Sequence, residues 1–197
     1  MTQGTGLRER KRIKTMRQVQ EAALDLFDQH GFDAVTVERV AATAEVSPSS
    51  VYRYFGTKEG IVLWNPHQQS LGERLDHAVT ESPPLEAMRR AISAFAADAA
   101  EWDESRDQRR MRYLMEVPAI QAAAASHVAP MSARMAALLA ETTGREPTDF
   151  EVQVVSGALV GALLGAMHHW HSGGYTEPLA DVLDRTFDTV ANGLDLS

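Results

Sequence analysis

The stretch SPSSVYRYFGTKEGIVL, residues 47–63, is unusually rich in hydrogen-bonding side chains for so short a segment. Ser47-Pro48 is a strong helix start, because a hydroxyl N-cap is followed by proline at the first helical position. This helix ends near Phe55-Gly56, and Thr57 is placed to cap the next one. The stretch therefore predicts two short helices, the first of which exposes mainly polar side chains.

The residues before this stretch predict two further helices. Apolar residues recur at helical spacing between Arg8 and His30, and Gly31 is placed to end that helix. Thr36 then caps the short segment VERVAATA, and the chain turns at Val46-Ser47. A short helix, a tight turn and a second short helix form a helix-turn-helix, in which the second helix enters the major groove of DNA.

The polar side chains of the helix at 47–55 suit that role. Base edges in the major groove and phosphate oxygens offer many acceptors, so exposed donors favour DNA binding. Arg53 can make a two-pronged contact to guanine, and the small Ser49 and Ser50 let the helix sit deep. Tyr52, Tyr54, Thr36 and Lys58 suit phosphates. The alternative is a polar surface helix with buried tyrosine rings.

The rest of the chain shows helical periodicity and no sustained alternation, which predicts an all-α protein of about nine helices. Further helices are expected after Pro84, over 104–117, after Pro130, from a Thr148/Glu151 capping box to about 171, and after Pro178. We expect an N-terminal three-helix DNA-binding domain, residues 1–64, and a helical ligand-binding and dimerisation domain, residues 65–197.

The net charge of −8 is unevenly distributed. Residues 1–64 carry nine Lys/Arg against eight Asp/Glu, whereas residues 65–197 carry ten against nineteen. The first segment is especially basic, which favours a polyanionic partner for this end of the chain; the alternative is a solvated charge run. Its six cations are Arg8, Arg10, Lys11, Arg12, Lys14 and Arg17.

Composition excludes several other classes. The chain has no cysteine, so disulfides and thiolate metal sites are excluded. The N-terminus lacks the apolar stretch of a secretory signal. The longest apolar run, 154–167, is shorter than the roughly 20 residues that span a bilayer. The lack of cysteine and of a secretory signal fits a cytoplasmic protein. Common catalytic motifs such as G-x-S-x-G, the Walker loop and H-E-x-x-H are absent, so we expect that the protein is not an enzyme.

Residues 18–63 resemble the N-terminal domain of TetR-family transcriptional regulators. The resemblance runs through ALDLFDQHGF, TVERVA, VSPSSVYRYF and TKE. It implies a recognition helix at 47–55, and one departure is Glu45, where members usually have glycine; we expect Glu45 to point to solvent. The complete predicted DNA-binding set is Arg12, Thr36, Ser47, Ser49, Ser50, Tyr52, Arg53, Tyr54 and Lys58.

The resemblance also implies a larger helical domain that dimerises and holds a small effector. Gly157, Gly161 and Gly165 give one helix a face of small side chains, where another helix can pack closely inside the monomer or across a two-fold axis. The last helix offers apolar residues at helical spacing for a four-helix dimer interface, namely Leu179, Val182, Leu183, Thr186, Phe187 and Val190.

Bulky, flexible apolar side chains in the middle helices suit a cavity for a hydrophobic effector, although core filling explains most of them individually. The ligand-binding candidates are Met88, Ile92, Phe95, Trp102, Met111, Leu114, Met115 and Met135. Arg109, Arg110 and Arg112 could bind an anionic headgroup, or face water and Glu116. The segment RRMRYLMEVPAI, with HHWH and GGY, is similar to regulators that include the mycofactocin-associated ones, which implies an acyl-type effector such as an acyl-CoA.

His168, His169 and His171 raise the question of a metal, since His168 and His171 share a helical face. Histidines at a helix end also interact favourably with the helix dipole, and we predict no metal or other cofactor. The sequence thus predicts a homodimeric regulator, in repressor mode, of a palindromic operator, released by a small hydrophobic effector. The alternative is a helical small-molecule-binding dimer without sequence-specific DNA binding.

Overall fold

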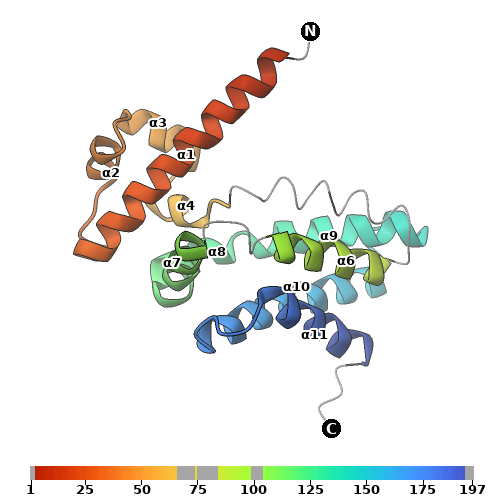
Figure 1. Ribbon diagram of the computed structural model, residues 1–197. Coiled ribbons are helices and arrows are strands. Elements are labelled where there is room, and N and C mark those ends of the chain that lie inside the picture. Colours follow the sequence, from red (N-terminus) through yellow and green to blue (C-terminus); the bar gives the residue numbers. More distant parts are fainter. Residues whose placement is uncertain (1–2, 66–73, 75–83, 99–103, 194–197) are drawn as a thin grey trace. The chain divides into compact units, whose positions relative to one another are not determined.

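The computed structural model describes residues 3–65, 74, 84–98 and 104–193 (Figure 1). Every element in these residues is a helix, which confirms the predicted all-α fold. The chain divides into two compact units. The head comprises residues 1–66 and 105–123, and the body comprises residues 67–104 and 124–197. Each unit is described by itself.

The head contains α1 (Gln3–His30), α2 (Val37–Thr43), α3 (Pro48–Phe55), α4 (Lys58–Leu63), α7 (Glu104–Glu116) and α8 (Pro118–Ala125). The predicted caps of its short helices are confirmed. The side chains of Thr36, Ser47 and Thr57 each accept a hydrogen bond from the backbone N–H three residues later. Gly31 ends α1 at a φ of 81°, a left-handed conformation that glycine adopts without steric cost.

The core of the head forms along one face of α1. Because apolar residues recur every three or four positions, they line one side of the helix, and α2, α3 and α4 pack against it. The buried members from these four helices and their connections include Val19, Ala23, Leu24, Phe27, Phe32, Val35, Val40, Val51, Ile61 and Val62.

One buried polar residue ties α4 to α1. Gln20 is fully buried, and its Nε2 donates to the carbonyl oxygens of Ile61 at 2.7 Å and Trp64 at 2.9 Å. These carbonyls lie at the C-terminal end of α4, where helical carbonyls lack partners within the helix. The Gln20 amide therefore holds the end of α4 in a fixed place on α1.

Helices α7 and α8 complete the same core. Tyr113 and Ile120 are buried in the apolar cluster of the head, and the Tyr113 ring meets Phe27 edge-on at 5.6 Å between centroids. The sequence predicts two consecutive domains that meet at residue 64. The head, however, also contains residues 105–123, which include most of α7 and α8 and which the prediction assigned to the second domain. They belong to the head because Tyr113 and Ile120 are buried in its apolar core.

The body contains α6 (Pro84–Asp98), α9 (Val128–Thr143), α10 (Phe150–Ser172) and α11 (Leu179–Ala191). Helices α9 and α11 both pack on α10, and α6 packs on α11. Gly144 ends α9 in a left-handed conformation, as its position predicts.

Two local predictions for the second half of the chain are wrong. Asp149, rather than Thr148, is the N-cap of α10, and its side chain makes no capping hydrogen bond there. Asp149 instead accepts from the backbone N–H of Glu146. Helix α9 begins at Val128, so that Pro130 lies in its first turn, and the alanine-rich segment after Pro118 forms α8. Proline is compatible with a first helical turn, where the backbone N–H groups have no intrahelical acceptor.

The contact between Tyr113 and Asp28 makes the stability of the head depend on pH. Burial, together with the hydrogen bond from the Tyr113 hydroxyl to Asp28 Oδ1 at 2.7 Å, raises the pKa of Tyr113 to about 12. A raised folded-state pKa means that the stabilisation is present below about pH 10, the ordinary tyrosine pKa, and is lost as the pH rises toward 12.

We therefore predict that wild type is more stable than Tyr113→Phe by about 1 kcal/mol at neutral pH. This difference should shrink between pH 10 and 12, because only wild type must release the Tyr113 proton. Denaturant unfolding of both proteins across this range measures it. A difference in the free energy of unfolding that stays constant up to pH 12 would contradict the prediction.

Candidate DNA-binding interface

The turn between α2 and α3 is held from two sides. Val46 N donates to Ala41 O at 2.9 Å, and Gln18 of α1 donates through Nε2 to Ala44 O at 3.0 Å. Between them Glu45 adopts a φ of 54°, a left-handed conformation in which a side chain carrying a Cβ is strained. The Glu45 side chain is exposed, as predicted. This turn sets the direction in which α3 leaves α2.

The polar side chains at the start of α3 form one hydrogen-bonded network. Ser47 Oγ lies 2.9 Å from the hydroxyl of Ser49 and 2.9 Å from that of Ser50. Arg53 Nη2 donates to Ser50 Oγ at 3.2 Å and to the Tyr54 hydroxyl at 3.3 Å. The guanidinium also lies over the Tyr54 ring, 4.8 Å from its centroid. These contacts restrict the Arg53 side chain before any ligand binds, which reduces the entropy lost on binding.

Arg12 is an exposed cation of α1. Its guanidinium pairs with Glu9, the two groups being 2.7 Å apart. The hydrogen bond with Glu9 is the main cause that raises the pKa of Arg12, and the Tyr54 hydroxyl contributes to the same shift.

Two predicted DNA-binding residues have partners elsewhere. The Tyr52 hydroxyl donates to Glu38 Oε1 of α2 at 3.4 Å, and Tyr52 is half exposed. Lys58 Nζ donates to Phe32 O at 2.7 Å and to Val35 O at 3.0 Å. Lys58 therefore holds the connection between α1 and α2, and one of its three donors is left for a phosphate.

Three polar residues at this surface were not among the predicted site residues. Gln18 stabilises the turn between α2 and α3, and Glu38 accepts the hydrogen bond from the Tyr52 hydroxyl. The Arg39 guanidinium donates to His30 Nε2 at 2.6 Å. Gln18 carries no sequence signal, because its role depends on a carbonyl twenty-six residues away. Glu38 and Arg39 are recognisable only as exposed positions on α2.

The three-dimensional grouping sharpens the charge asymmetry of the chain. Residues 1–66 and 105–123 together carry thirteen Lys/Arg against ten Asp/Glu, so the head has a net charge of +3. The body carries six against seventeen, a net charge of −11. Attraction to a polyanion is therefore concentrated in the unit that presents α3.

The predicted ligand-binding residues fall in both units. Met88, Ile92 and Met135 are buried in one apolar cluster of the body. In the head, Met111 is buried, Met115 is half-buried, and Leu114 packs against the apolar core. The side chain of Phe95, and Trp102 as a whole, lie outside the described part of the structure.

The arginines of α7 separate into different environments. Arg109 and Arg112 pair with carboxylates of α1. Arg110 is nearly buried, and its Nε lies 3.5 Å from Asp107 Oδ1. Burial lowers the pKa of Arg110, and the nearby Asp107 opposes that shift. An anionic headgroup bound by these three arginines together is therefore not supported by their positions.

The histidines at the end of α10 also have individual partners or are exposed. His168 is exposed, His169 lies 3.6 Å from Glu177, and His171 Nδ1 lies 2.7 Å from the Tyr175 hydroxyl. Within the residues that the structure describes, no three His, Asp or Glu side chains gather as metal ligands would.

One face of α10 is left uncovered by the residues that the structure describes. A Cβ built at Gly157, Gly161 or Gly165 would meet no atom within 4 Å. Phe150 on the same helix is 77% exposed and Val154 is 51% exposed. Helix α10 is long and apolar enough to cross a membrane by length and composition, a test that core helices also meet. None of the described residues therefore packs closely against the small residues of α10.

Three of the six α11 residues predicted for a dimer interface lie in the core of the body. Val182, Leu183 and Phe187 are buried inside the body, in the core that α11 forms with α6 and α10. Leu179 and Val190 are only partly buried against that core, and the predicted contribution of α11 to a dimer interface stays a prediction.

Comparison with protein families matches both halves of the chain. Residues 20–63 match the family of bacterial regulatory proteins of the tetR type, and residues 82–195 match the MftR C-terminal domain. A Mycobacterium tuberculosis protein named as the mycofactocin biosynthesis transcriptional regulator MftR is 30% identical over 191 residues, covering 94% of each chain.

Two solved structures share the fold. NalD, the secondary repressor of the MexAB-OprM multidrug efflux pump of Pseudomonas aeruginosa, superimposes with a TM-score of 0.62 at 20% identity, covering 91% of this chain and 96% of NalD. FadR from Thermus thermophilus, a transcriptional repressor in complex with lauroyl-CoA, gives a TM-score of 0.57 at 20% identity, covering 92% and 96%.

We predict that Glu45→Gly stabilises the head by about 1 kcal/mol, because glycine removes the steric cost of the left-handed turn residue. Denaturant unfolding measures the gain. Glu45→Ala is the matched control, since it removes the same charge but keeps the Cβ and should gain little. Equal effects of the two substitutions would show that charge, rather than backbone strain, determines the stability at this position.

Proposed function

The chain belongs to the TetR family of bacterial transcriptional regulators, and we propose that it acts as a cytoplasmic repressor that binds a palindromic operator as a homodimer and is released by a small hydrophobic effector. The observation that carries the proposal is the network of Ser47, Ser49, Ser50, Arg53 and Tyr54 on α3. This network presents restrained donors on the helix that a helix-turn-helix places in the major groove.

Direct readout of bases is assigned to the side chains of α3. Arg53 is suited to the two acceptors of guanine, and the short Ser49 and Ser50 permit close approach of the helix. Arg12, Tyr52, Tyr54, Thr36, Ser47 and Lys58 are proposed to bind phosphates and fix the register. The remaining cations of α1 add a salt-dependent contribution to affinity.

Dimerisation is assigned to the open face of α10. Small residues permit close approach of two helices, and exposed apolar side chains at Phe150 and Val154 gain by being buried. We propose that the homodimer supplies two copies of α3 to one duplex. Two half-sites about one helical turn apart, roughly 34–36 Å, would then be read together.

The effector is proposed to be an acyl compound such as an acyl-CoA. The buried methionines Met88 and Met135 adapt to irregular apolar partners, and in FadR the same fold holds lauroyl-CoA. Release of DNA requires that the effector bind the DNA-free arrangement more tightly than the DNA-bound one, because otherwise no equilibrium shifts.

The first prediction concerns DNA recognition. Footprinting on the DNA that flanks the protein's own coding sequence should show a palindromic site for wild type. Arg53→Ala should weaken binding to it by about 1–3 kcal/mol and relax discrimination at one base pair in each half-site. Arg145→Ala in the body is the control. Salt-sensitive binding without a footprint would favour the alternative, a small-molecule-binding dimer that does not read sequence.

The second prediction concerns the dimer. Gly161→Arg should convert a dimer into a monomer, because it places a long charged side chain in the proposed contact of two α10 helices. Sedimentation velocity measures the change. Ala137→Arg, at an exposed position of α9, adds the same charge away from this face and should remain dimeric. A monomeric wild type, or a dimeric Gly161→Arg, would refute the assigned interface.

A further inference from the structure

The face of α1 that points away from the core is divided by charge. Its positions recur every three or four residues and therefore lie on one side of the helix. The basic half comes first along the chain and is exposed; it consists of Arg10, Lys14 and Arg17. The acidic stripe follows and consists of Glu21, Asp25 and Asp28.

Helix α7 places one guanidinium among all three carboxylates of the acidic stripe. Arg109 Nη2 lies 2.7 Å from Asp25 Oδ1, its Nε lies 2.8 Å from Asp28 Oδ2, and its Nη1 lies 3.3 Å from Glu21 Oε1. The Arg109 side chain is 20% exposed, so these pairs are partly shielded from water. A shielded group that meets three partners is more strongly held than an isolated surface pair.

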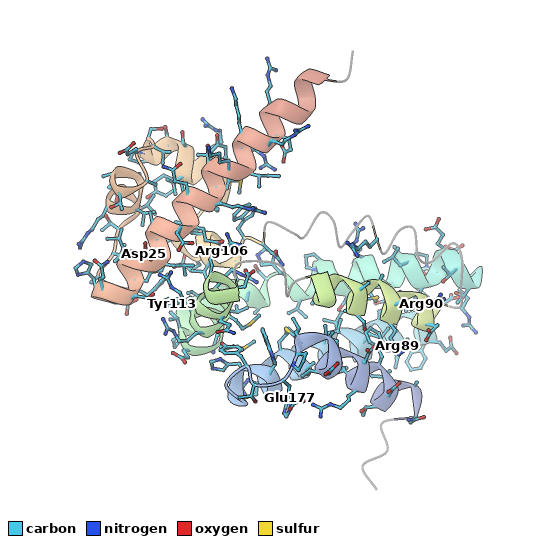
Figure 2. All side chains as sticks on the ribbon, in the orientation of Figure 1. Asp25, Arg89, Arg90, Arg106, Tyr113 and Glu177 are labelled. Atoms are coloured by element: carbon cyan, nitrogen blue, oxygen red, sulfur yellow. The ribbon has the colours of Figure 1, made fainter. Side chains whose placement is uncertain are left out.

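Two neighbouring residues of α7 reinforce the contact at Asp28. Arg112 Nη2 lies 2.5 Å from Asp28 Oδ1, and the Tyr113 hydroxyl donates to the same oxygen. Figure 2 shows Asp25 on α1 and Tyr113 on α7 at this junction. We name Arg109, Arg112 and Tyr113 the α7 clasp.

The acidic stripe lies close to the cations that are proposed to meet DNA. Glu21 follows Arg17 by four positions, about 6 Å along the helix axis at 1.5 Å per residue. This separation is shorter than the Debye length of about 8 Å at physiological salt. Uncovered carboxylates would therefore oppose the attraction of the basic half of α1 for phosphates.

We propose that the α7 clasp neutralises the acidic stripe of α1, so that docking of α7 raises the affinity of the head for DNA and undocking lowers it. The inference rests on the proposed DNA-binding function and adds a means of regulating it. Arg109 and Arg112 are positioning residues that act through α1, without contacting DNA. Any ligand that alters the docking of α7 thereby alters operator affinity.

The test measures binding of the full-length protein to a duplex that carries the footprinted operator. Arg109→Gln should lower the affinity about fivefold or more, which lies within the usual range of coupling between sites. The loss should diminish at high salt, where uncovered charges are screened. Arg145→Gln breaks an exposed ion pair of the body and should leave the affinity unchanged.

A rescue variant separates neutralisation from packing. In the Arg109→Gln background, the substitutions Glu21→Gln, Asp25→Asn and Asp28→Asn remove the uncovered charges and should restore affinity to within about twofold of wild type. The exposed Arg112→Gln gives a milder loss and serves if Arg109→Gln does not fold. Unchanged affinity in the folded arginine variants, or failure of the rescue in a folded protein, would overturn the proposal. Absence of a wild-type footprint would instead overturn the proposed function and, with it, the clasp.

Discussion

The structure of the head depends on burial of the apolar face of α1. The apolar residues of this long helix form one continuous face that must be removed from water, and no single short helix can cover that face. Helices α2, α3 and α4 cover part of this apolar face, and Tyr113 of α7 and Ile120 of α8 cover more of it. The orientation of α3 is therefore a consequence of how several short elements share one hydrophobic surface.

Polar contacts then fix what hydrophobic burial leaves adjustable. Apolar packing is non-directional, whereas hydrogen bonds require defined distances and angles. Gln18 holds the turn before α3, Gln20 holds the end of α4, and Lys58 holds the connection before α2. Each bond uses a side-chain donor and a backbone carbonyl that lies outside regular helical pairing. The position of α3 is thus stabilised by side chains that bind the backbone of the head and that need not contact DNA.

Charge links this scaffold to its function. The head is basic and the body is strongly acidic. The arginines of α7 contribute to the positive charge of the head, although α7 is distant in sequence from α1 to α4. Arg109 and Arg112 are attractive candidates for a headgroup site when only the run RRMR is considered. Their carboxylate partners on α1 assign them to the junction of α1 and α7.

Local sequence determined the helical fold, the caps at Thr36, Ser47 and Thr57, and the position of helix α3. These features depend on residues within one or two turns of each other, whose spacing is visible in the chain. It did not reveal that a Cβ at Gly60 would overlap the Phe55 carbonyl oxygen, that Val182 and Phe187 belong to the core of the body, or that Arg109 meets three carboxylates of α1. Those facts depend on which surfaces meet after folding, and only the tertiary structure decides them, because contacts between distant residues leave no periodic pattern in the sequence.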